Sequence, residues 1–268
     1  MQFRPCIDIH NGMVKQIVGS SLKDAGDRAA ENFVAAQDAS FFAEIYKKNQ
    51  IEGAHVILLN GKDSPYYEKT RQQAYKALAA YPGHMQVGGG ITPENAQAYL
   101  DAGADKVIVT SYVFQDGRIC EENLKNLSGE VGKERLVLDV SCREKDGEYY
   151  IVTDRWQKFT DVKLNDATLD YFAGYCSEFL VHAVDVEGKS GGIEEPLVGL
   201  LGAWNRIPVT YAGGVHSYED LQRLYELGDG KIHVTIGSAL DLYGGKLRFD
   251  EVLEWCRSRE KPCDTAIT

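Results

Sequence analysis

The chain has 268 residues, of which 44% are hydrophobic, 26% charged and 10% aromatic, a composition typical of a globular protein and not of a disordered or fibrous one. Its net charge of −11 at pH 7 disfavours a protein that follows the phosphate backbone of a nucleic acid, so no nucleic-acid partner is expected. The charge does not exclude a small phosphorylated ligand, because backbone amides bind phosphate without a net positive charge.

No targeting or membrane segment is expected. The first residues lack the basic stretch and apolar run of a signal peptide, and the longest apolar runs, of about five residues, are far shorter than the roughly 20 residues that cross a bilayer. The six cysteines show no C-x-x-C pair and no metal-binding spacing with histidine, as expected for reduced thiols. We therefore expect a cytoplasmic protein without a metal site and without a membrane partner.

Short β-branched apolar runs alternate with amphipathic stretches along the whole chain. In chain order, the pattern predicts strands at residues 3–9, 55–59, 85–87, 106–109, 135–138, 179–184, 207–211 and 232–236. Helices are predicted at residues 39–48, 67–80, 93–102, 121–131, 166–176, 194–204, 217–226 and 249–257. Ser217 followed by Asp220 resembles a capping box that begins one of these helices.

Strands that alternate with helices, and that are apolar at successive positions, indicate a parallel sheet covered by helices. A (βα)8 barrel needs about 250 residues, so we expect a single α/β barrel domain over residues 1–268. A doubly wound open sheet is the alternative fold.

Two segments do not fit a bare barrel, and both follow predicted strands. Residues 13–19 alternate like a strand, and residues 141–158 read as a β-hairpin. Loops that follow barrel strands lie on the catalytic face, so we expect both segments there. The second segment carries Arg143, an anion-binding side chain, and Trp156, an aromatic platform for a ligand.

The chain also contains a weak two-fold repeat. In the first half, three strands end at Asp8, at Gly89 and Gly90, and at Thr110 and Ser111. In the second half, about 125 to 130 residues later, three strands end at Asp139, at Gly213 and Gly214, and at Gly237 and Ser238. The repeat predicts a barrel built from two similar half-barrels.

Each half therefore offers the parts of one phosphate site. Paired glycines between a strand and a helix let backbone amides approach an anion closely, and the hydroxyl groups of the following turn add donors. Two such sites on opposite rims of the barrel would hold a small molecule that carries two phosphates. We expect a bis-phosphorylated small molecule to be the ligand of a monomeric protein.

Carboxyl groups stand where catalytic groups of barrels lie. Asp8 and Asp139 are predicted at equivalent positions at the carboxyl ends of opposite strands, and one protonated and one ionised carboxyl group suit acid–base chemistry. Asp185 on the sixth strand is a third candidate. His10 is expected in a loop near the site, and His182 in a structural role within a strand.

Several segments resemble one enzyme family over residues 3–257. They are CIDIHNGMVKQIVG (6–19), HVI (55–57), QVGGGI (86–91), KVIVTS (106–111), LDVSCR (138–143), HAVDVEGKSGGI (182–193), YAGGV (211–215) and IGSALDLYGG (236–245). The chain resembles the histidine-biosynthesis isomerases that act on phosphoribosylformimino-aminoimidazole-carboxamide ribotide (ProFAR), in their eukaryotic-like subgroup. The resemblance implies a (βα)8 barrel that converts the aminoaldose ProFAR to the aminoketose PRFAR by an Amadori rearrangement, with no metal or cofactor.

The resemblance also implies roles for individual residues. Asp8 matches the general base that removes the C2′ proton, and Asp139 matches the aspartate that assists ring opening or orients the sugar. One phosphate site is implied at Gly89, Gly90, Thr110 and Ser111, and the other at Gly213, Gly214, Gly237 and Ser238. Arg143 and Trp156 match the loop that folds over the substrate.

The sequence departs from the bacterial members of that family at two strands. Their sixth strand carries D-x-x-x-D-G, whose second aspartate is often the general acid. The corresponding segment reads DVEGKSGG, so the acid is Asp185, Glu187 or Asp139. The second strand ends in LNG (59–61) in place of D-L-D, which fits the eukaryotic-like subgroup.

Three other functions stay open. The cyclase subunit of imidazole glycerol phosphate synthase shares the barrel, the duplication and both aspartates, but it needs a glutaminase partner, and the VSCR and DVEG segments and Trp156 favour the isomerase. Phosphoribosylanthranilate isomerase uses a cysteine base, and Cys6 lies on the same strand face as Asp8. A phosphosugar-binding barrel without catalysis would keep the phosphate sites alone.

Overall fold

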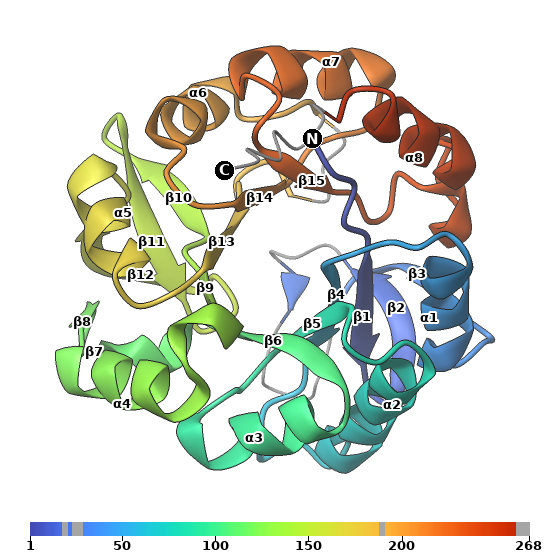
Figure 1. The fold of residues 1–268 in the computed structure, drawn as a ribbon, viewed down its shortest axis with the longest axis horizontal. Coiled ribbons are helices and arrows are strands. Elements are labelled where there is room, and N and C mark those ends of the chain that lie inside the picture. Colours follow the sequence, from blue (N-terminus) through green and yellow to red (C-terminus); the bar gives the residue numbers. More distant parts are fainter. Residues whose placement is uncertain (18–20, 23–28, 188–190, 261–268) are drawn as a thin grey trace, which may run out of the picture.

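The computed structural model describes residues 1–17, 21–22, 29–187 and 191–260. In this part of the chain a ring of parallel strands is surrounded by helices (Figure 1). In pairing order, the ring consists of β1 (Cys6–His10), β4 (Ala54–Leu58), β5 (Met85–Gly88), β6 (Ala104–Val109), β9 (Leu136–Asp139), β13 (Glu178–His182), β14 (Val209–Ala212) and β15 (His233–Thr235). The helices are α1 (Ala39–Lys48), α2 (Tyr67–Ala80), α3 (Pro93–Asp101), α4 (Glu121–Val131), α5 (Asp166–Ala173), α6 (Glu195–Trp204), α7 (Tyr218–Leu227) and α8 (Phe249–Arg257).

The ring closes just before β1. Phe3 and Val234 form a parallel bridge, and the backbone N–H of Arg4 donates to the carbonyl of Val234 at 2.8 Å. The first and last strands are therefore neighbours. The predicted (βα)8 barrel is confirmed, and the open doubly wound sheet is wrong.

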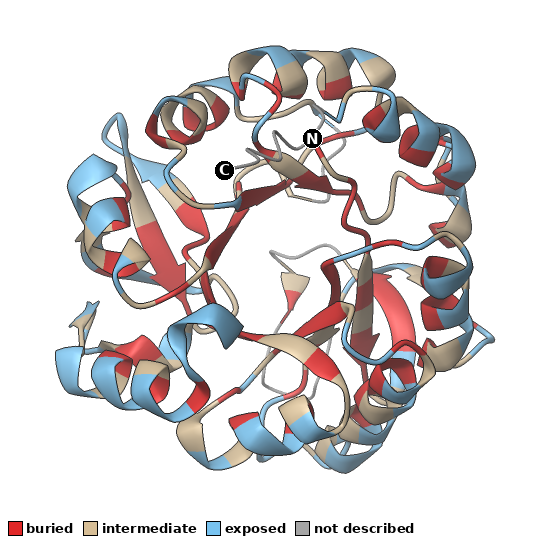
Figure 2. Cartoon of the chain, in the orientation of Figure 1, coloured by how far each residue is buried: buried red, intermediate tan, exposed pale blue. Residues whose placement is uncertain are grey.

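Burial explains why the strand sequences are continuously apolar. Figure 2 shows the strands mostly buried, with the exposed residues on the outer faces of the helices. One side of each strand faces the barrel interior and the other side faces the helices, so both sides exclude water. The predicted capping box is present at α7, where the Ser217 hydroxyl accepts from the N–H of Asp220 and the Asp220 carboxylate accepts from the N–H of Ser217. None of the helices in the described ranges has the length and apolar character needed to cross a membrane.

The first extra segment extends the ring. β2 (Met13–Ile17) pairs with β1 in antiparallel register, and β3 (Glu31–Val34), which the sequence did not predict, pairs with β2. Asn11 and Gly12 connect β1 to β2 with positive φ angles of 53° and 75°, the conformation that the Asn-Gly pair favours in a two-residue hairpin. Residues 18–19 of the predicted strand lie outside the described residues.

The second extra segment is a small antiparallel sheet of its own. The predicted hairpin is β10 (Cys142–Lys145) and β11 (Glu148–Thr153), and β12 (Lys158–Lys163) adds a third strand. β7 (Phe114–Gln115) and β8 (Arg118–Ile119) form a further short hairpin after β6. Short 3₁₀ helices lie at η2 (Ser111–Val113), η3 (Lys133–Arg135) and η4 (Asp241–Tyr243).

Candidate active site

A cavity of about 570 Å³ opens at the carboxyl ends of the barrel strands. Every predicted site residue except Arg143 and Asp185 lines it. The lining includes Asp8, Gly89, Gly90, Thr110, Ser111, Asp139, Trp156, Gly213, Gly214, Gly237 and Ser238.

The order of strands places the two halves of the site opposite each other. Asp8 lies on β1 and Asp139 ends β9, and three strands separate them on either side of the ring. The glycine pairs follow β5 and β14, which are opposed in the same way. The two carboxylates therefore face each other across the cavity, and the two glycine turns lie on the other diameter.

The two glycine turns repeat the same backbone conformation. φ is 105° at Gly89 and 122° at Gly213, and it is 70° at Gly90 and 76° at Gly214. A Cβ at Gly89 would lie 2.1 Å from the carbonyl oxygen of Leu58, and one at Gly213 would lie 2.9 Å from that of Ala183. Glycine is required at both positions because the neighbouring strand leaves no room for a side chain.

Asp8 is a carboxyl group of the cavity with a strongly raised pKa. Burial raises its pKa to about 6, with a smaller lowering effect from His182 and a further raising effect from Glu187. Its Oδ2 accepts hydrogen bonds from the Gln16 amide at 3.2 Å and from the Cys6 thiol at 3.6 Å. A carboxylate with this pKa is ionised at neutral pH and is a stronger base than an ordinary aspartate.

Asp139 is held in a different environment. Its Oδ1 accepts hydrogen bonds from the N–H of Ser141 at 2.9 Å and from the Ser141 hydroxyl. The same hydroxyl also contacts His182, whose ring lines the cavity. Asp139 is therefore fixed in orientation by Ser141, two residues after the end of β9.

The two candidate acids that follow β13, Asp185 and Glu187, lie in different surroundings. Asp185 forms an ion pair with Arg143, with Oδ1 2.9 Å from Nε, and accepts from the N–H of Glu144. Neither Asp185 nor Arg143 is among the residues that line the cavity. This pair instead joins the β10–β12 sheet to the end of β13. Glu187 does line the cavity, and burial raises its pKa.

The loop between β11 and β12 reaches into the cavity. Asp154, Arg155 and Trp156 have positive φ angles of 51°, 56° and 66°, a strained conformation for three successive non-glycine residues. Trp156 packs against His182 with 4.9 Å between ring centroids, and the N–H of Asp154 donates to the Ser111 hydroxyl at 3.1 Å. The loop thus crosses from the second half of the barrel to the phosphate turn of the first half.

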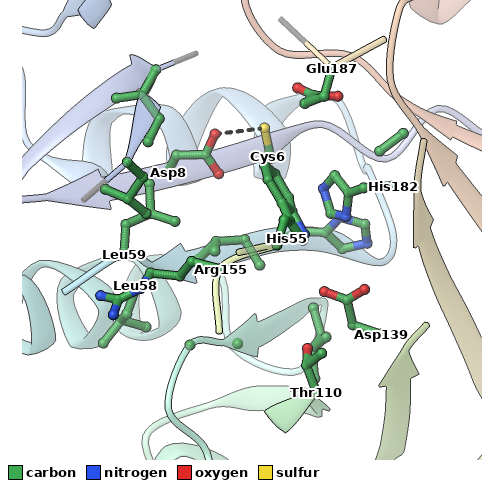
Figure 3. A pocket seen from close by; sticks show the side chains of 18 of the residues that line it. Cys6, Asp8, His55, Leu58, Leu59, Thr110, Asp139, Arg155, His182 and Glu187 are labelled. Atoms are coloured by element: carbon green, nitrogen blue, oxygen red, sulfur yellow. Dashed lines mark hydrogen bonds between the residues drawn. The ribbon is translucent and has the colours of Figure 1, made fainter. Parts of the chain in front are cut away.

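Several cavity residues did not stand out in the sequence as site residues. They are Gln16, His55, Lys62, Arg155 and His182, and Figure 3 shows His182 and His55 beside Cys6 and Asp8. Alternate residues of a barrel strand point inward. The sequence therefore predicted that Cys6 and Asp8 share one face of a strand, and both line the cavity. His10 is buried in β1 and is not among the cavity-lining residues.

The family model for histidine biosynthesis proteins matches residues 2–248. The chain belongs to the histidine biosynthesis protein family. The sequence-based prediction of this family is therefore confirmed, together with its (βα)8 fold.

Curated relatives share nearly the whole chain. A chloroplastic protein of Medicago truncatula is 52% identical over 259 residues, which cover 95% of this chain and 81% of the relative. Proteins of Yarrowia lipolytica and Saccharomyces cerevisiae are 44% and 40% identical, and each alignment covers at least 95% of both chains. All three relatives are named as the imidazole-4-carboxamide isomerase whose substrate is abbreviated ProFAR above.

Proposed function

We propose that this protein is a ProFAR isomerase that converts the aminoaldose ProFAR to the aminoketose PRFAR by acid–base catalysis. The observation that carries the proposal is the pair of opposed carboxylates, Asp8 and Asp139, set in one cavity between two opposed glycine turns. A substrate with a phosphate at each end fits this arrangement, and the names of the relatives support it.

In this proposal Asp8 is the general base that removes the proton from C2′. Its pKa of about 6 leaves it ionised at neutral pH, and the hydrogen bond from Gln16 aims one oxygen lone pair. The hydrogen bond from the Cys6 thiol goes to the same oxygen, Oδ2. A base with a pKa close to the working pH combines the correct protonation state with strong proton affinity.

Glu187 is the general acid that protonates the ring oxygen and opens the ribose. Burial raises its pKa, which favours the protonated form that an acid needs. Asp185 does not fit this role because its two oxygens bind Arg143 and the backbone of Glu144. Asp139 fits orientation of the sugar better than proton donation, since its Oδ1 is already bound by the N–H and the hydroxyl of Ser141.

The phosphates bind at the two glycine turns. Gly89, Gly90, Thr110 and Ser111 form one site, and Gly213, Gly214, Gly237 and Ser238 form the other. Backbone amides supply the donors, so binding does not depend on net charge. Trp156 covers the reacting sugar, and the cavity-lining cations Lys62 and Arg155 add positive charge on the side of the first phosphate.

The decisive experiment is an ultraviolet assay with ProFAR in the absence of glutaminase and ammonia. We expect conversion by the wild type, and we expect Asp8→Asn to lose at least about 10²-fold in kcat, the usual size of a general-base contribution, while it still binds the substrate in calorimetry. A wild type that binds without turnover would indicate a non-catalytic barrel. No turnover of ProFAR together with ammonia-dependent turnover of PRFAR would indicate the cyclase, and near-full activity of Asp8→Asn would remove Asp8 from the mechanism.

We further propose that the protein works as a monomer in the cytoplasm, without a nucleic-acid partner. The acidic net charge argues against a nucleic-acid partner, and cysteines without C-x-x-C spacing fit the reduced thiols of a cytoplasmic protein. Sedimentation at several protein concentrations tests the monomer, and cell fractionation tests the location.

A further inference from the structure

His182 ends β13 and is held by Ser141 in a defined orientation. The Ser141 hydroxyl lies 2.9 Å from His182 Nδ1 and also 2.9 Å from the backbone N of His182, and it donates to Asp139 Oδ1. A hydroxyl has one proton to donate and lone pairs that accept. Since its proton goes to the carboxylate and the backbone N–H is itself a donor, Nδ1 of His182 must carry a proton and donate to Ser141.

This hydrogen bonding fixes the tautomer of the neutral ring. With the proton on Nδ1, the lone pair lies on Nε2. The ring lines the cavity, and in Figure 3 it lies between Glu187 and Asp139. Asp139, Ser141 and His182 therefore form a hydrogen-bonded chain that presents Nε2 as a proton acceptor.

The surroundings of His182 are acidic. Its acidic neighbours are Asp139 at the end of β9, Asp8 on β1 and Glu187 after β13. The other groups that face the ring are Ser141, Cys6, His55 and Trp156. A positive charge on His182 lowers the pKa of both Asp8 and Glu187. The imidazole is thus close enough to both carboxyl groups to interact with them electrostatically.

We propose that His182 accepts the enol proton in the second half of the rearrangement and returns it to Glu187. This role rests on the proposed isomerase function and names a residue that the Asp8 and Glu187 steps leave unused. Glu187 first gives a proton to the ring oxygen, and Asp8 takes the C2′ proton, which leaves an enolamine with a hydroxyl on C2′. In the second half, Nε2 of His182 takes the proton of the C2′ hydroxyl, and the electron pair of that O–H bond forms the C2′ carbonyl. The electron pair of the C1′–C2′ double bond takes the proton from Asp8 at C1′. Transfer of that proton to Glu187 restores every group, and no external oxidant or reductant is required.

The kinetic test compares His182→Gln with Asp8→Asn in D2O. We expect His182→Gln to lose at least about 10²-fold in kcat, yet to introduce deuterium at C2′ of recovered ProFAR faster than it forms product, because ring opening and C2′ deprotonation do not need His182. Asp8→Asn is expected to lose both exchange and turnover. The matched control is His84→Gln, an exposed histidine paired with Glu52 outside the cavity, which should change neither rate.

Ser141→Ala tests the hydroxyl that orients both His182 and Asp139. It removes the hydroxyl but leaves the imidazole, so we expect a loss of at least about tenfold in kcat, the effect of one hydrogen bond, and Ser141→Thr should recover much of it. The matched control is Ser128→Ala, whose hydroxyl donates to the Tyr175 carbonyl on the outside of the barrel.

A measurement on the unaltered protein keeps the proposal testable if a variant fails to fold. In 13C,15N-labelled protein without substrate, the imidazole of His182, assigned through its own backbone resonances, should show in its neutral form a protonated Nδ1 and an unprotonated Nε2. The opposite tautomer would overturn the proposal, as would a kcat of His182→Gln within about threefold of wild type, or a loss of C2′ exchange equal to that of Asp8→Asn. Because the tautomer is read without turnover, a failure of the isomerase assay itself stays distinguishable from a failure of His182.

Discussion

Burial of Asp8 makes its carboxylate a stronger base and at the same time lowers the stability of the folded protein. The cavity surrounds its carboxyl group with protein, and this desolvation is the largest cause of its raised pKa of about 6. The hydrogen bonds from Cys6 and Gln16 favour the ionised form but do not offset the burial. The folded protein therefore holds a carboxylate that would be more stable in water.

The sign of the effect on stability follows from linkage. The ordinary pKa of Asp8 is 3.8 and its folded pKa is about 6, so the folded state binds more protons than the unfolded state between these values. The contribution of Asp8 to the free energy of unfolding therefore falls as pH rises from about 4 to about 6 and stays low above that. Asp8→Asn should be more stable than wild type at neutral pH by about 1 to 3 kcal/mol, since one pKa unit corresponds to about 1.4 kcal/mol.

Urea unfolding at a series of pH values measures this difference. The gain of Asp8→Asn should vanish below about pH 4, where both forms of the site are neutral. The exposed Asp63 provides the control, because Asp63→Asn makes the same change of side chain at the surface, away from any buried pocket. A destabilised Asp8→Asn at neutral pH would contradict the raised pKa.

The two glycine turns are the elements that repeat most faithfully between the half-barrels. Their φ angles agree within 20° at both positions, and in each case the preceding neighbour strand blocks a Cβ at the first glycine. A turn that must stay this close to the adjacent strand presents its backbone, and no side chain, to the ligand. The same geometry explains how an acidic protein can hold phosphate.

Gly89→Ala tests this close approach. The Cβ would lie 2.1 Å from the Leu58 carbonyl oxygen and φ is 105°, so the turn must move away from β4. We expect a loss of at least about 2 kcal/mol in the free energy of unfolding and a KM for ProFAR raised at least about tenfold. Gly83→Ala is the control, because φ is 82° there but no atom lies within 4 Å of a Cβ; it should cost about 1 kcal/mol and leave KM unchanged. Equal effects of the two variants would show that backbone strain alone, without the contact, explains the loss.

The sequence predicted the elements of the barrel because the helical and strand periods are local properties. The turns Asn11–Gly12 and Asp146–Gly147 also have positive φ angles and dipeptides that favour two-residue hairpins, although the sequence analysis did not single them out. β3 was missed because its four residues, three of them exposed, carry no apolar alternation. β12 was missed because its sequence, KFTDVK, shows no apolar alternation, and because the turn before it contains no glycine at the left-handed residues 154–156.

The candidate site was predictable where chemistry coincides with a strand end. Asp8, Asp139 and both glycine pairs line the cavity for that reason. The sequence could not show which of Asp185 and Glu187 faces the cavity. The two residues are only two positions apart, yet Asp185 pairs with Arg143 and Glu187 lines the cavity. His182 needed the three-dimensional contact with Ser141, a residue that lies 41 positions earlier in the chain.

At the scale of the whole molecule, a buried charge cluster closes the end of the barrel opposite the cavity. Glu178, at the start of β13, is 1% exposed and pairs with Arg4. Its oxygens also accept from Gln86 at 2.9 Å and from Thr210 at 3.1 Å, and Lys106 lies 3.4 Å away. These partners come from the segment before β1 and from β5, β6 and β14, so one carboxylate links strands around most of the ring.

Glu178→Gln should therefore destabilise the fold strongly while the cavity keeps its geometry. Loss of the charge leaves Arg4 buried without its counter-ion, and breaking a buried pair in this way costs about 3 to 5 kcal/mol. The exposed pair of Glu52 and His84 is the matched control, because Glu52→Gln should change the free energy of unfolding by less than about 1 kcal/mol. Urea unfolding at about 0.1 M and about 1 M salt separates the two cases, since salt screens exposed pairs far more than buried ones. The loss in Glu178→Gln should persist at high salt, and a loss below about 1 kcal/mol would mean that the hydrogen bonds from Gln86 and Thr210, and not the charge, hold the strands together.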